Sequence, residues 1–487
     1  MAKEISDAQI ENANHRPNSP SDLGPDPGTI QGRAIQQQEH NRGYLETLKK
    51  DPWLLFWIGV MLWTLIVRGF ENQSSGSVIS IPDFKQRFGQ LQDGEYFIET
   101  KWQSALSGGS NAAAIVGSWA ASYFADKFGV KPVILVAAAI NIASVGPFVS
   151  AIMSYYTSSW EGAWSWKSLI CAQWGFAVVG LVGQIFMPES PVYLVRRGKF
   201  DQARKSLNQL YSDPHDAEGH LQRIKLTLEE AETQQDSVSY TDCFRGTNLR
   251  RTMIAIMVFL SEPMSGLGFV SNYGALMYQY LGIGDQQSFL IQIGAQILSM
   301  SGATISFLIG DMFGRRPMYL GGCIGLTLLL LCMGIAGSVD TNAATTAAVG
   351  FYTMYNFFYN AGVGSNVYTI AGEVPTSVLR TKTLAVALSV SAAVNTMWSF
   401  VAPYMFNPGY GGLKAKIGFV FGAFMLLFAV MAYFFVPETR RRTYEELDEL
   451  FMNRVPTREF REYVTLAERR AAEAYQVTEK VPEAVRV

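Results

Sequence analysis

Histidine and cysteine are scarce in this sequence, with four of each among 487 residues. The cysteines lack the paired spacing of disulfide frameworks and zinc sites, which argues against a disulfide scaffold and a metal cluster. The histidines lie in polar stretches, at His15, His40, His215 and His220. A proton relay inside an apolar segment would therefore have to use carboxylates. Because no activated nucleophile and no phosphate-binding loop is present either, we expect neither an enzyme nor a cofactor.

Charged residues are also few, at 16% of the chain, whereas 49% of the residues are hydrophobic. That balance is too apolar for an ordinary soluble enzyme and indicates the lipid bilayer. A helix needs about 20 mostly apolar residues to cross the bilayer. Ten such spans are predicted, beginning near residues 53, 104, 132, 168, 252, 289, 317, 345, 383 and 416. No basic cluster suggests a nucleic-acid partner.

The polar stretches divide the chain into five predicted parts. Residues 1–51 lack the apolar core of a signal peptide and are predicted to be a disordered cytosolic tail. Residues 52–189 are predicted to form a first bundle of four spans, residues 190–250 a cytosolic linker with amphipathic helices, and residues 251–438 a second bundle of six spans. Residues 439–487 are predicted to form a cytosolic C-terminal tail.

Lys and Arg are concentrated in alternate loops, which are the loops expected to face the cytosol. The basic residues of these loops are Lys127, Lys131, Arg196, Arg197, Lys199, Arg315, Arg316, Arg380, Lys382 and Arg440 to Arg442. The opposite loops around 276–288 and 338–344 carry no Lys or Arg, although Lys414 and Lys416 are minor exceptions. With an even number of spans, both termini are predicted to be cytosolic.

Two short motifs occur once in each half of the chain. The turns "ADKFGVKP" (125–132) and "GDMFGRRP" (310–317) each join two spans, and "PES" at Pro188 and "PET" at Pro437 each end a bundle. Pro437 lies 126 residues after Asp311, whereas Pro188 lies only 62 residues after Asp126. The first half is therefore about 64 residues shorter, which is room for two helices and their connections.

These motifs carry a family resemblance from about residue 50 to 455. The two turns, "PESPVYLVRRGKFDQA", "AGEVPTSVLRTKT" and "VPETRRRTYEELDELF" resemble the sugar-porter branch of the major facilitator superfamily. "RGFENQSSGSVISIPDFKQRFG" and "SGLGFVSNYGALMYQYLG" resemble its fungal maltose or α-glucoside permease subgroup. The resemblance implies an all-α polytopic membrane protein that works by alternating access around a central site. We expect this chain to have about ten transmembrane helices, four plus six, instead of the twelve of that family.

The sequence departs from that family in the first half. The G-R-x-x-x-G motif and the P-x-x-x-R-G loop of the fourth and fifth spans are absent, and residues 154–167 are too short and polar to span. The fourth and fifth spans are therefore expected to be missing, together with basic partners for Glu71 and Glu189. The chain is either a truncated product or isoform, or a ten-span variant in its own right.

An acid in the first predicted span is the candidate for proton coupling. Arg68 and Glu71 are three residues apart and share a helix face. Glu71 matches the acid of proton-coupled relatives, and burial would raise its pKa enough for it to load and release a proton. The alternative is that Glu71 simply pairs with Arg68.

The resemblance places substrate binding at polar and aromatic side chains of several spans. These are Asn72, Glu262, Ser265, Asn272, Tyr273, Asn356, Asn360, Asn395 and Trp398. Amides, hydroxyls and an aromatic face suit a neutral sugar. Glu262 and Pro263 stand where the subgroup has Gln and Asn, which adds a charge and predicts a helix break at Pro263. Packing between helices explains each polar residue equally well.

A second charged set belongs to the cytosolic motifs and is interpreted as a gate that closes the two bundles inside. Its members are Asp126, Glu189, Asp311, Arg315, Glu373, Arg380 and Glu438. The alternative is ordinary solvation of charges at helix ends.

The function predicted from the sequence is proton-coupled uptake of an α-glucoside sugar across the plasma membrane, impaired by the loss of two helices. The expected partners are a sugar, protons and the bilayer. Two alternatives remain open: a transporter of another small polar solute or secondary metabolite, and a membrane sensor that does not transport.

Overall fold

The computed structural model describes residues 52–92, 95–108, 145–235, 239–376, 378–407, 409–440, 442 and 444–465. Asp126, the predicted N-terminal tail, the span predicted near 132 and most of the span predicted near 104 lie outside these residues. The chain divides into two compact units. Unit 1 contains the described residues 52–59 and 186–235, and unit 2 contains the others.

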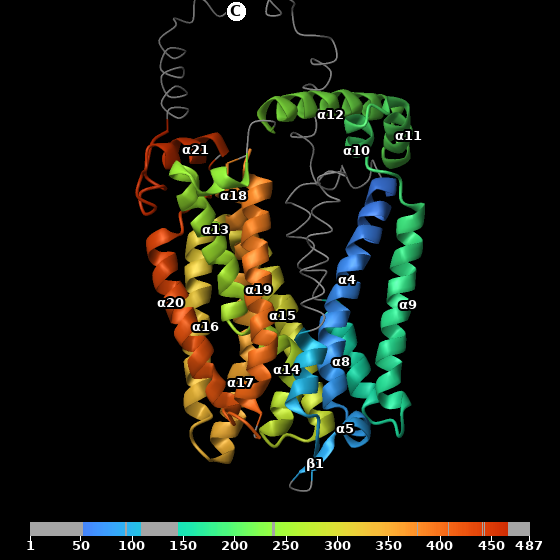
Figure 1. The fold of residues 1–487 in the computed structure, drawn as a ribbon, viewed down its shortest axis with the longest axis vertical. Helices are drawn as coiled ribbons and strands as arrows, with labels where there is room; N and C mark the ends of the chain where they lie inside the picture. The colour runs from blue at the N-terminus through green and yellow to red at the C-terminus, as the bar shows by residue number, and fades with distance from the viewer. Residues whose placement is uncertain are drawn as a thin grey trace, which may run out of the picture. The chain divides into compact units, whose positions relative to one another are not determined.

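Unit 2 is built mainly from long apolar helices that run side by side (Figure 1). Those of the second half are α13 (Gly246–Met264), α14 (Leu267–Tyr280), α15 (Asp285–Phe313), α16 (Arg315–Ala336), α17 (Asn342–Phe358), η2 (Tyr359–Gly364), α18 (Ser365–Glu373), α19 (Arg380–Phe406) and α20 (Ile417–Phe435), with short 3-10 turns η1 (Tyr240–Phe244) and η3 (Lys414–Lys416). α13 packs on α19, and α16 packs on both α17 and α20. The aromatic side chains of Phe259, Tyr273, Tyr352 and Phe421 are buried in this core.

The first half contributes shorter pieces to unit 2. They are α4 (Pro52–Ser80, of which residues 52–59 belong to unit 1), α5 (Pro82–Phe88), the hairpin β1 (Gln90–Gln92) and β2 (Glu95–Phe97), helical residues 100–108, α8 (Val145–Thr157) and α9 (Trp164–Phe186). Pro82 occupies the first turn of α5, where its missing N–H costs nothing. α8 packs along α15, and its Gly146 lies against the α4 backbone at Ile66 and Phe70.

Six helices of the described residues are long and apolar enough to cross a membrane. They are Trp164–Gly183, Gly246–Tyr280, Asp285–Gly310, Arg315–Ala336, Arg380–Phe406 and Lys414–Phe435. They coincide with the spans predicted near 168, 252, 289, 317, 383 and 416. The span predicted near 53 lies in the 29-residue α4, whose apolar stretch Pro52–Trp63 is shorter, and that near 345 falls in the 17-residue α17. The total of ten spans is thus not confirmed.

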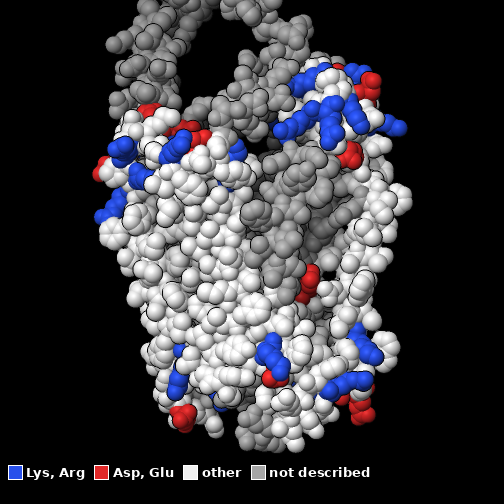
Figure 2. All heavy atoms as spheres, in the orientation of Figure 1, with Lys and Arg blue, Asp and Glu red and all other residues white. Residues whose placement is uncertain are grey.

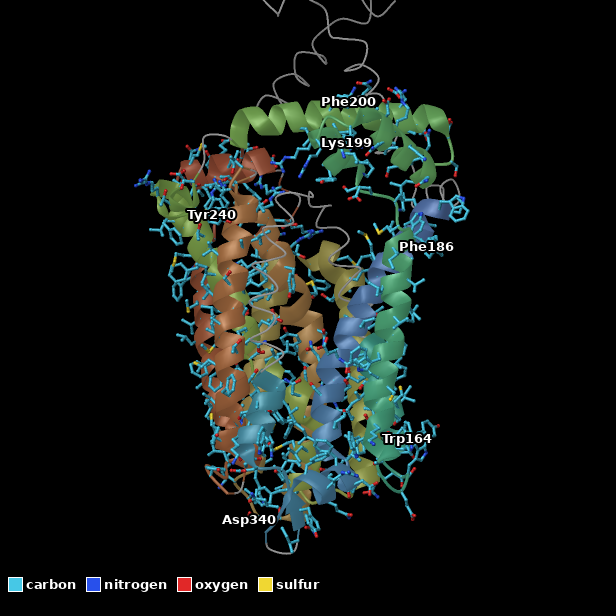
Figure 3. The ribbon with its side chains drawn as sticks, turned by 45° about the vertical axis from the view of Figure 1, so that its right-hand side comes forward. Trp164, Phe186, Lys199, Phe200, Tyr240 and Asp340 are labelled. Carbon is cyan, nitrogen blue, oxygen red and sulfur yellow. The ribbon has the colours of Figure 1, made fainter. Side chains whose placement is uncertain are left out.

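The surface of unit 2 has the pattern of a membrane protein. On the face shown in Figure 2, charged side chains gather at the two ends of the helices, and the surface between them is almost uncharged. Tyr240 and Asp340 mark these opposite ends in Figure 3. Large apolar side chains of α9 point outward, and Trp174 is 71% exposed. A bilayer would cover such a surface, because about 20 apolar residues match its thickness.

Unit 1 carries the polar linker as three helices, α10 (Pro191–Arg196), α11 (Phe200–Leu210) and α12 (Pro214–Gln235). Leu221, Ile224 and Leu228 lie on one face of α12 and pack with α10 and α11, as their spacing predicts. The Arg204 guanidinium lies 2.7 Å from Glu218. This hydrogen bond lowers the pKa of Glu218 from its ordinary value of 4.5.

Part of the predicted C-terminal tail is folded against the second-half helices. The short helix α21 (Tyr444–Met452) carries Asp448, which pairs with the buried Arg251 of α13. The Arg251 guanidinium also lies 4.5 Å from the Phe451 ring. Thr457 donates to the Phe434 carbonyl at 2.6 Å. Residues 444–465 thus close one end of the second half rather than trailing from it.

Candidate functional site

A helix break in the second half lies at the centre of the predicted substrate residues. Pro263 is predicted to break the helix, and α13 indeed ends at Met264. Gly266 has a φ of 84°, a conformation that favours glycine, and α14 starts directly after it. The buried Ser265 hydroxyl lies 2.8 Å from the Tyr355 hydroxyl on α17. The break therefore turns a polar side chain toward a neighbouring helix.

Glu262 lies one turn before this break and is half-buried. Its charge acts on the hydroxyls of Tyr355 and Tyr359, which stack with ring centroids 5.8 Å apart. A carboxylate at this position makes the surroundings of the two phenol groups more charged than an amide would.

A buried polar face on α15 adds three residues that the motifs do not point to. Gln292, Gln296 and Ser299 are all buried and follow one another at helix spacing. The Gln296 amide donates to Gln73 of α4 at 3.2 Å, and Asn360 donates to the Ser299 hydroxyl at 3.0 Å. Polar residues at i, i+4 and i+7 in an apolar helix are the signal that could have found this face.

The predicted flexible segment after Asn356 is a π-helical turn. η2 joins α17 to α18, and the Asn360 amide donates to the Asn356 carbonyl at 3.0 Å. Gly362 of η2 meets Gly322 of α16 backbone to backbone, with no room for a Cβ on either. π-Helical turns are rare and occur often at functional sites, so this one supports a polar site here.

Several buried polar atoms near these helices have no hydrogen-bond partner among the described residues, and two of them belong to the polar set. These two are the Trp398 indole nitrogen and Oε1 of Gln292. Trp398 packs against Phe421 with ring centroids 5.0 Å apart. Asn395, one turn earlier on α19, comes close to Gly268 of α14. Unpaired buried donors and acceptors cost free energy unless something binds them.

The first-span residues are less enclosed. Glu71 and Asn72 are exposed on α4, and their backbone carbonyls accept bonds from Ser74 and Ser75. The side chain of Arg68 lies outside the described set, so its pairing with Glu71 stays a prediction. Glu71 was expected to be buried, but the described residues leave it exposed.

The two halves of the chain are joined at the end of unit 2 where α4 leads into α5. The Tyr273 hydroxyl donates to Ser107 at 2.8 Å, and the Asn407 amide donates to Gln103 at 3.2 Å. A Cβ at Gly76 of α4 would overlap the backbone carbonyl of Asn272 on α14. Tyr273 and Asn272, both predicted to bind substrate, thus hold the halves together at this end.

The charged motifs of the second half meet at the other end. Arg315 lies 3.6 Å from Glu373, and its backbone N–H donates to the Glu438 carboxylate at 3.0 Å. Glu438 also accepts from the backbone of Arg440 at 3.0 Å. Arg380 starts α19 nearby in sequence, and the side chain of Asp311 is not described. Glu189 is exposed and belongs to unit 1.

Two of the cavities among the described residues bear on the site. The smaller, of about 10 Å³, is lined by Ser265 and apolar neighbours in the second-half core, and it is large enough for about one water. The larger, of about 420 Å³, lies beside α5 and the hairpin. Ser265 is the one predicted substrate residue that lines either of them.

The family is shown by a sequence model described as "Sugar (and other) transporter", which matches residues 141–451. The chain belongs to this family. Its helices long enough to cross a bilayer and its charge-poor surface agree with the multi-pass membrane location of such transporters.

Several known transporters are similar in sequence to this protein along most of its length. The general alpha-glucoside permease of Saccharomyces cerevisiae is 26% identical over 498 residues, covering 89% of this chain and 80% of that protein. The maltose permease MAL31 of the same species is 26% identical and covers 88% and 81%. The MFS transporter fmqE of Aspergillus fumigatus is 26% identical and covers 81% and 85%.

Solved structures of a sugar porter share the fold. The partially occluded inward open form of the xylose transporter XylE from E. coli aligns with a TM-score of 0.62 at 16% identity, over 80% of this chain and 100% of that one. XylE bound to 6-bromo-6-deoxy-D-glucose aligns with a TM-score of 0.59 at 17% identity, over 82% and 99%. The chain thus has the helical fold of the major facilitator superfamily.

Proposed function

We propose that this protein is a secondary active transporter that takes up an α-glucoside sugar with a proton. The observation that carries the proposal is the buried polar set around the break at Ser265 and Gly266, which includes the orphaned Trp398 indole and Gln292 carbonyl. Neutral sugars are bound by such amides, hydroxyls and aromatic rings. The similar permeases of yeast are named for α-glucosides and maltose.

The mechanism we propose is alternating access. The halves touch through Tyr273, Asn407 and Gly76 at one end of unit 2, which corresponds to a state closed at that end. By the distribution of basic residues this is the outer end, so we assign a state that is closed to the outside, with both termini cytosolic in the plasma membrane. The cluster of Arg315, Glu373 and Glu438 lies at the opposite end, and we assign it to the inner gate.

Glu71 is the proposed coupling acid. It is the acid that α4 presents at an exposed position beside Asn72, where a proton can reach it. A proton-driven carrier concentrates its solute inside the cell. A carrier that has lost the coupling acid can only exchange solute across the membrane.

Uptake of radiolabelled maltose by a yeast strain without maltose permeases tests this proposal. Cells with the protein should accumulate maltose above the external concentration, and a protonophore should abolish accumulation. Glu71→Gln should abolish accumulation but retain exchange of maltose across the membrane. Glu161→Gln, in the exposed turn between α8 and α9, is the matched control and should accumulate normally. Accumulation by Glu71→Gln would remove Glu71 from the coupling step.

A second candidate function rests on Glu262. A half-buried carboxylate beside two tyrosines favours a solute with amine or additional donor groups over a purely hydroxylated one. In competition assays against maltose, Glu262→Gln should improve sugar uptake if the native solute is a sugar. If another polar solute is native, Glu262→Gln should weaken its uptake and leave sugar uptake poor.

We also propose that this form lacks residues that its relatives have, leaving about ten spans. The alignment with the general alpha-glucoside permease extends over 498 positions, more than the 487 residues of the chain, and takes in 89% of the chain, about 433 residues. About 65 positions of the relative therefore face no residue here. That agrees with the shortage of about 64 residues between the two motif copies.

A further inference from the structure

The larger cavity lies where the first and second halves meet at the end of α14. It has a volume of about 420 Å³, within the ~300–1,000 Å³ of small-molecule sites. Figure 1 shows α5 and the hairpin at the same end of unit 2 as the loop that follows α14. The polar and aromatic residues of its lining are Lys85, Gln86, Tyr96, Phe97, Gln103, Gln279, Tyr280 and Asp285. None belongs to the polar set around Ser265.

We call this cavity the outer pocket. Hydrogen bonds to neighbouring residues hold its polar groups in place. The Lys85 ammonium donates to the side-chain amide oxygen of Gln279 at 2.6 Å. The side-chain amide nitrogen of Gln279 donates to the backbone carbonyl of Ser80 at 3.0 Å. The Tyr280 hydroxyl donates to Asn407 at 3.0 Å. Groups fixed in this way lose little entropy when they bind a ligand.

The chemistry of the lining selects a neutral, hydroxyl-rich ligand. Its charged members are one base, Lys85, and one acid, Asp285, so the lining does not favour an anion or a cation. Three glutamine amides supply both donors and acceptors. Tyr96, which is 43% exposed, and Tyr280 supply aromatic surface on which a sugar ring can stack. A saccharide presents these complementary groups.

We propose that the outer pocket is a second saccharide-binding site, separate from the site around Ser265. This inference rests on the proposed function for the class of its ligand. Because the Lys85 to Gln279 bond joins α5 to α14 across the pocket wall, the site exists while the halves are closed at this end. A sugar bound there stabilises the closed outer end, since a ligand favours the state that binds it.

Equilibrium binding of radiolabelled maltose to the purified full-length protein tests this proposal. The native protein should show two classes of site. Tyr96→Ala should weaken one class roughly tenfold or remove it, whereas Tyr96→Phe should retain both because the ring remains. Tyr156→Ala, which truncates a tyrosine of α8 that is 63% exposed, is the matched control.

The outcomes separate this site from the transport function. If maltose binding has one class of site that Tyr96→Ala leaves unchanged, the outer pocket does not bind sugar, even where maltose uptake is normal. If the native protein takes up no maltose but binds it at a class of site lost in Tyr96→Ala, the transport proposal fails and the outer site stands. Binding of maltose that Tyr96→Ala and Tyr156→Ala weaken equally would also overturn the assignment.

Discussion

The indole N–H of Trp398 is a buried donor without a partner among the described residues. Leaving such a group unpaired costs about 1–3 kcal/mol, whereas its ring packs well against Phe421 and Phe424. Trp398→Phe keeps an aromatic ring at this position and removes the donor. We expect the variant to be at least as stable as the native protein and the KM for maltose to rise about three- to tenfold.

Trp166 provides the control for that prediction. Its indole nitrogen is also buried without a partner among the described residues, and its ring packs against Phe84 and Phe88. Trp166→Phe should leave the KM unchanged. Melting curves in detergent and uptake kinetics measure both variants. If the two substitutions change the KM alike, Trp398 is a packing residue and the site must be sought elsewhere.

The sequence indicates which residue types form the site, but it does not indicate their partners. Ser265 and Asn360 were candidates because of their motifs, and each bonds another helix, at Tyr355 and at Ser299. Those partners lie 90 and 61 residues away along the chain. Local spacing reports which face of a helix is polar, whereas the neighbour of that face is decided by packing. Gln73 shows this most clearly, because its partner on α15 is 223 residues distant.

Among the elements, the contact of α4 with α14 depends on one small residue. A Cβ at Gly76 would overlap the backbone carbonyl of Asn272, and backbone cannot yield as a flexible side chain does. Gly76→Ala should therefore force the outer ends of the two helices apart. We expect maltose uptake to fall at least about tenfold and external labelling of a cysteine placed at Ser107 to increase.

Gly175 of α9 is the matched control for Gly76, because nothing lies within 4 Å of a Cβ built there. Gly175→Ala should be neutral in uptake and in labelling. Unchanged labelling in Gly76→Ala with loss of folding would mean that the contact stabilises the fold alone and has no part in gating.

The linker helices give a pH prediction. The hydrogen bond from Arg204 holds the pKa of Glu218 below 4.5, so the pair stabilises the packing of α11 on α12 above that pH. The contribution is lost as the pH falls through the lowered pKa, because the protonated acid no longer pairs. Hydrogen exchange of α11 and α12 amides, corrected for intrinsic rates, should quicken below about pH 4.5 in the full chain.

In Glu218→Gln the exchange of these helices should be faster at neutral pH and should lose this dependence on pH. Asp201→Asn, which neutralises an exposed acid on the same helix as Arg204, should keep it. A native protein whose linker exchange is constant down to pH 3 would show that the pair contributes nothing to the linker.

At the scale of the whole molecule, the internal repeat predicts a position for the segment that we propose is missing. In the second half, the fifth helix α19 contacts the first helix α13 and also residues 100–108, the second helix of the first half. If the two halves repeat this arrangement, the fifth helix of the first half should contact the first helix of its own half, α4, and the second helix of the other half, α15. α8 makes these two contacts. In the proposed ten-span arrangement we therefore assign α8 to the position of the fifth span.

This assignment predicts a different position for the shortage from the one that the sequence predicts. The motif spacing predicts how many residues are missing, because it compares the distance between the same two motifs in each half of the chain. It cannot tell which helix is cut, since a third and a fifth span run in the same direction through the membrane. With α8 (Val145–Thr157) placed by the repeat at the position of a fifth span, we propose that the missing stretch lies before α8, whereas the sequence predicts it at 154–167.

The transcript decides between these positions. Amplification across the codons for residues 100–170 from the source mRNA should yield, besides any short product, one longer by about 195 nucleotides, the length that encodes about 65 residues. We expect the extra sequence upstream of the codon for Val145, because α8 already occupies the place of a fifth span. When expressed, the longer form should accumulate maltose faster than the short form, since a full fifth span and its preceding helix would enclose Glu71.

An insertion between the codons for Ser154 and Trp166 would instead make α8 the end of a third span. A single short product would identify the ten-span chain as the natural transporter.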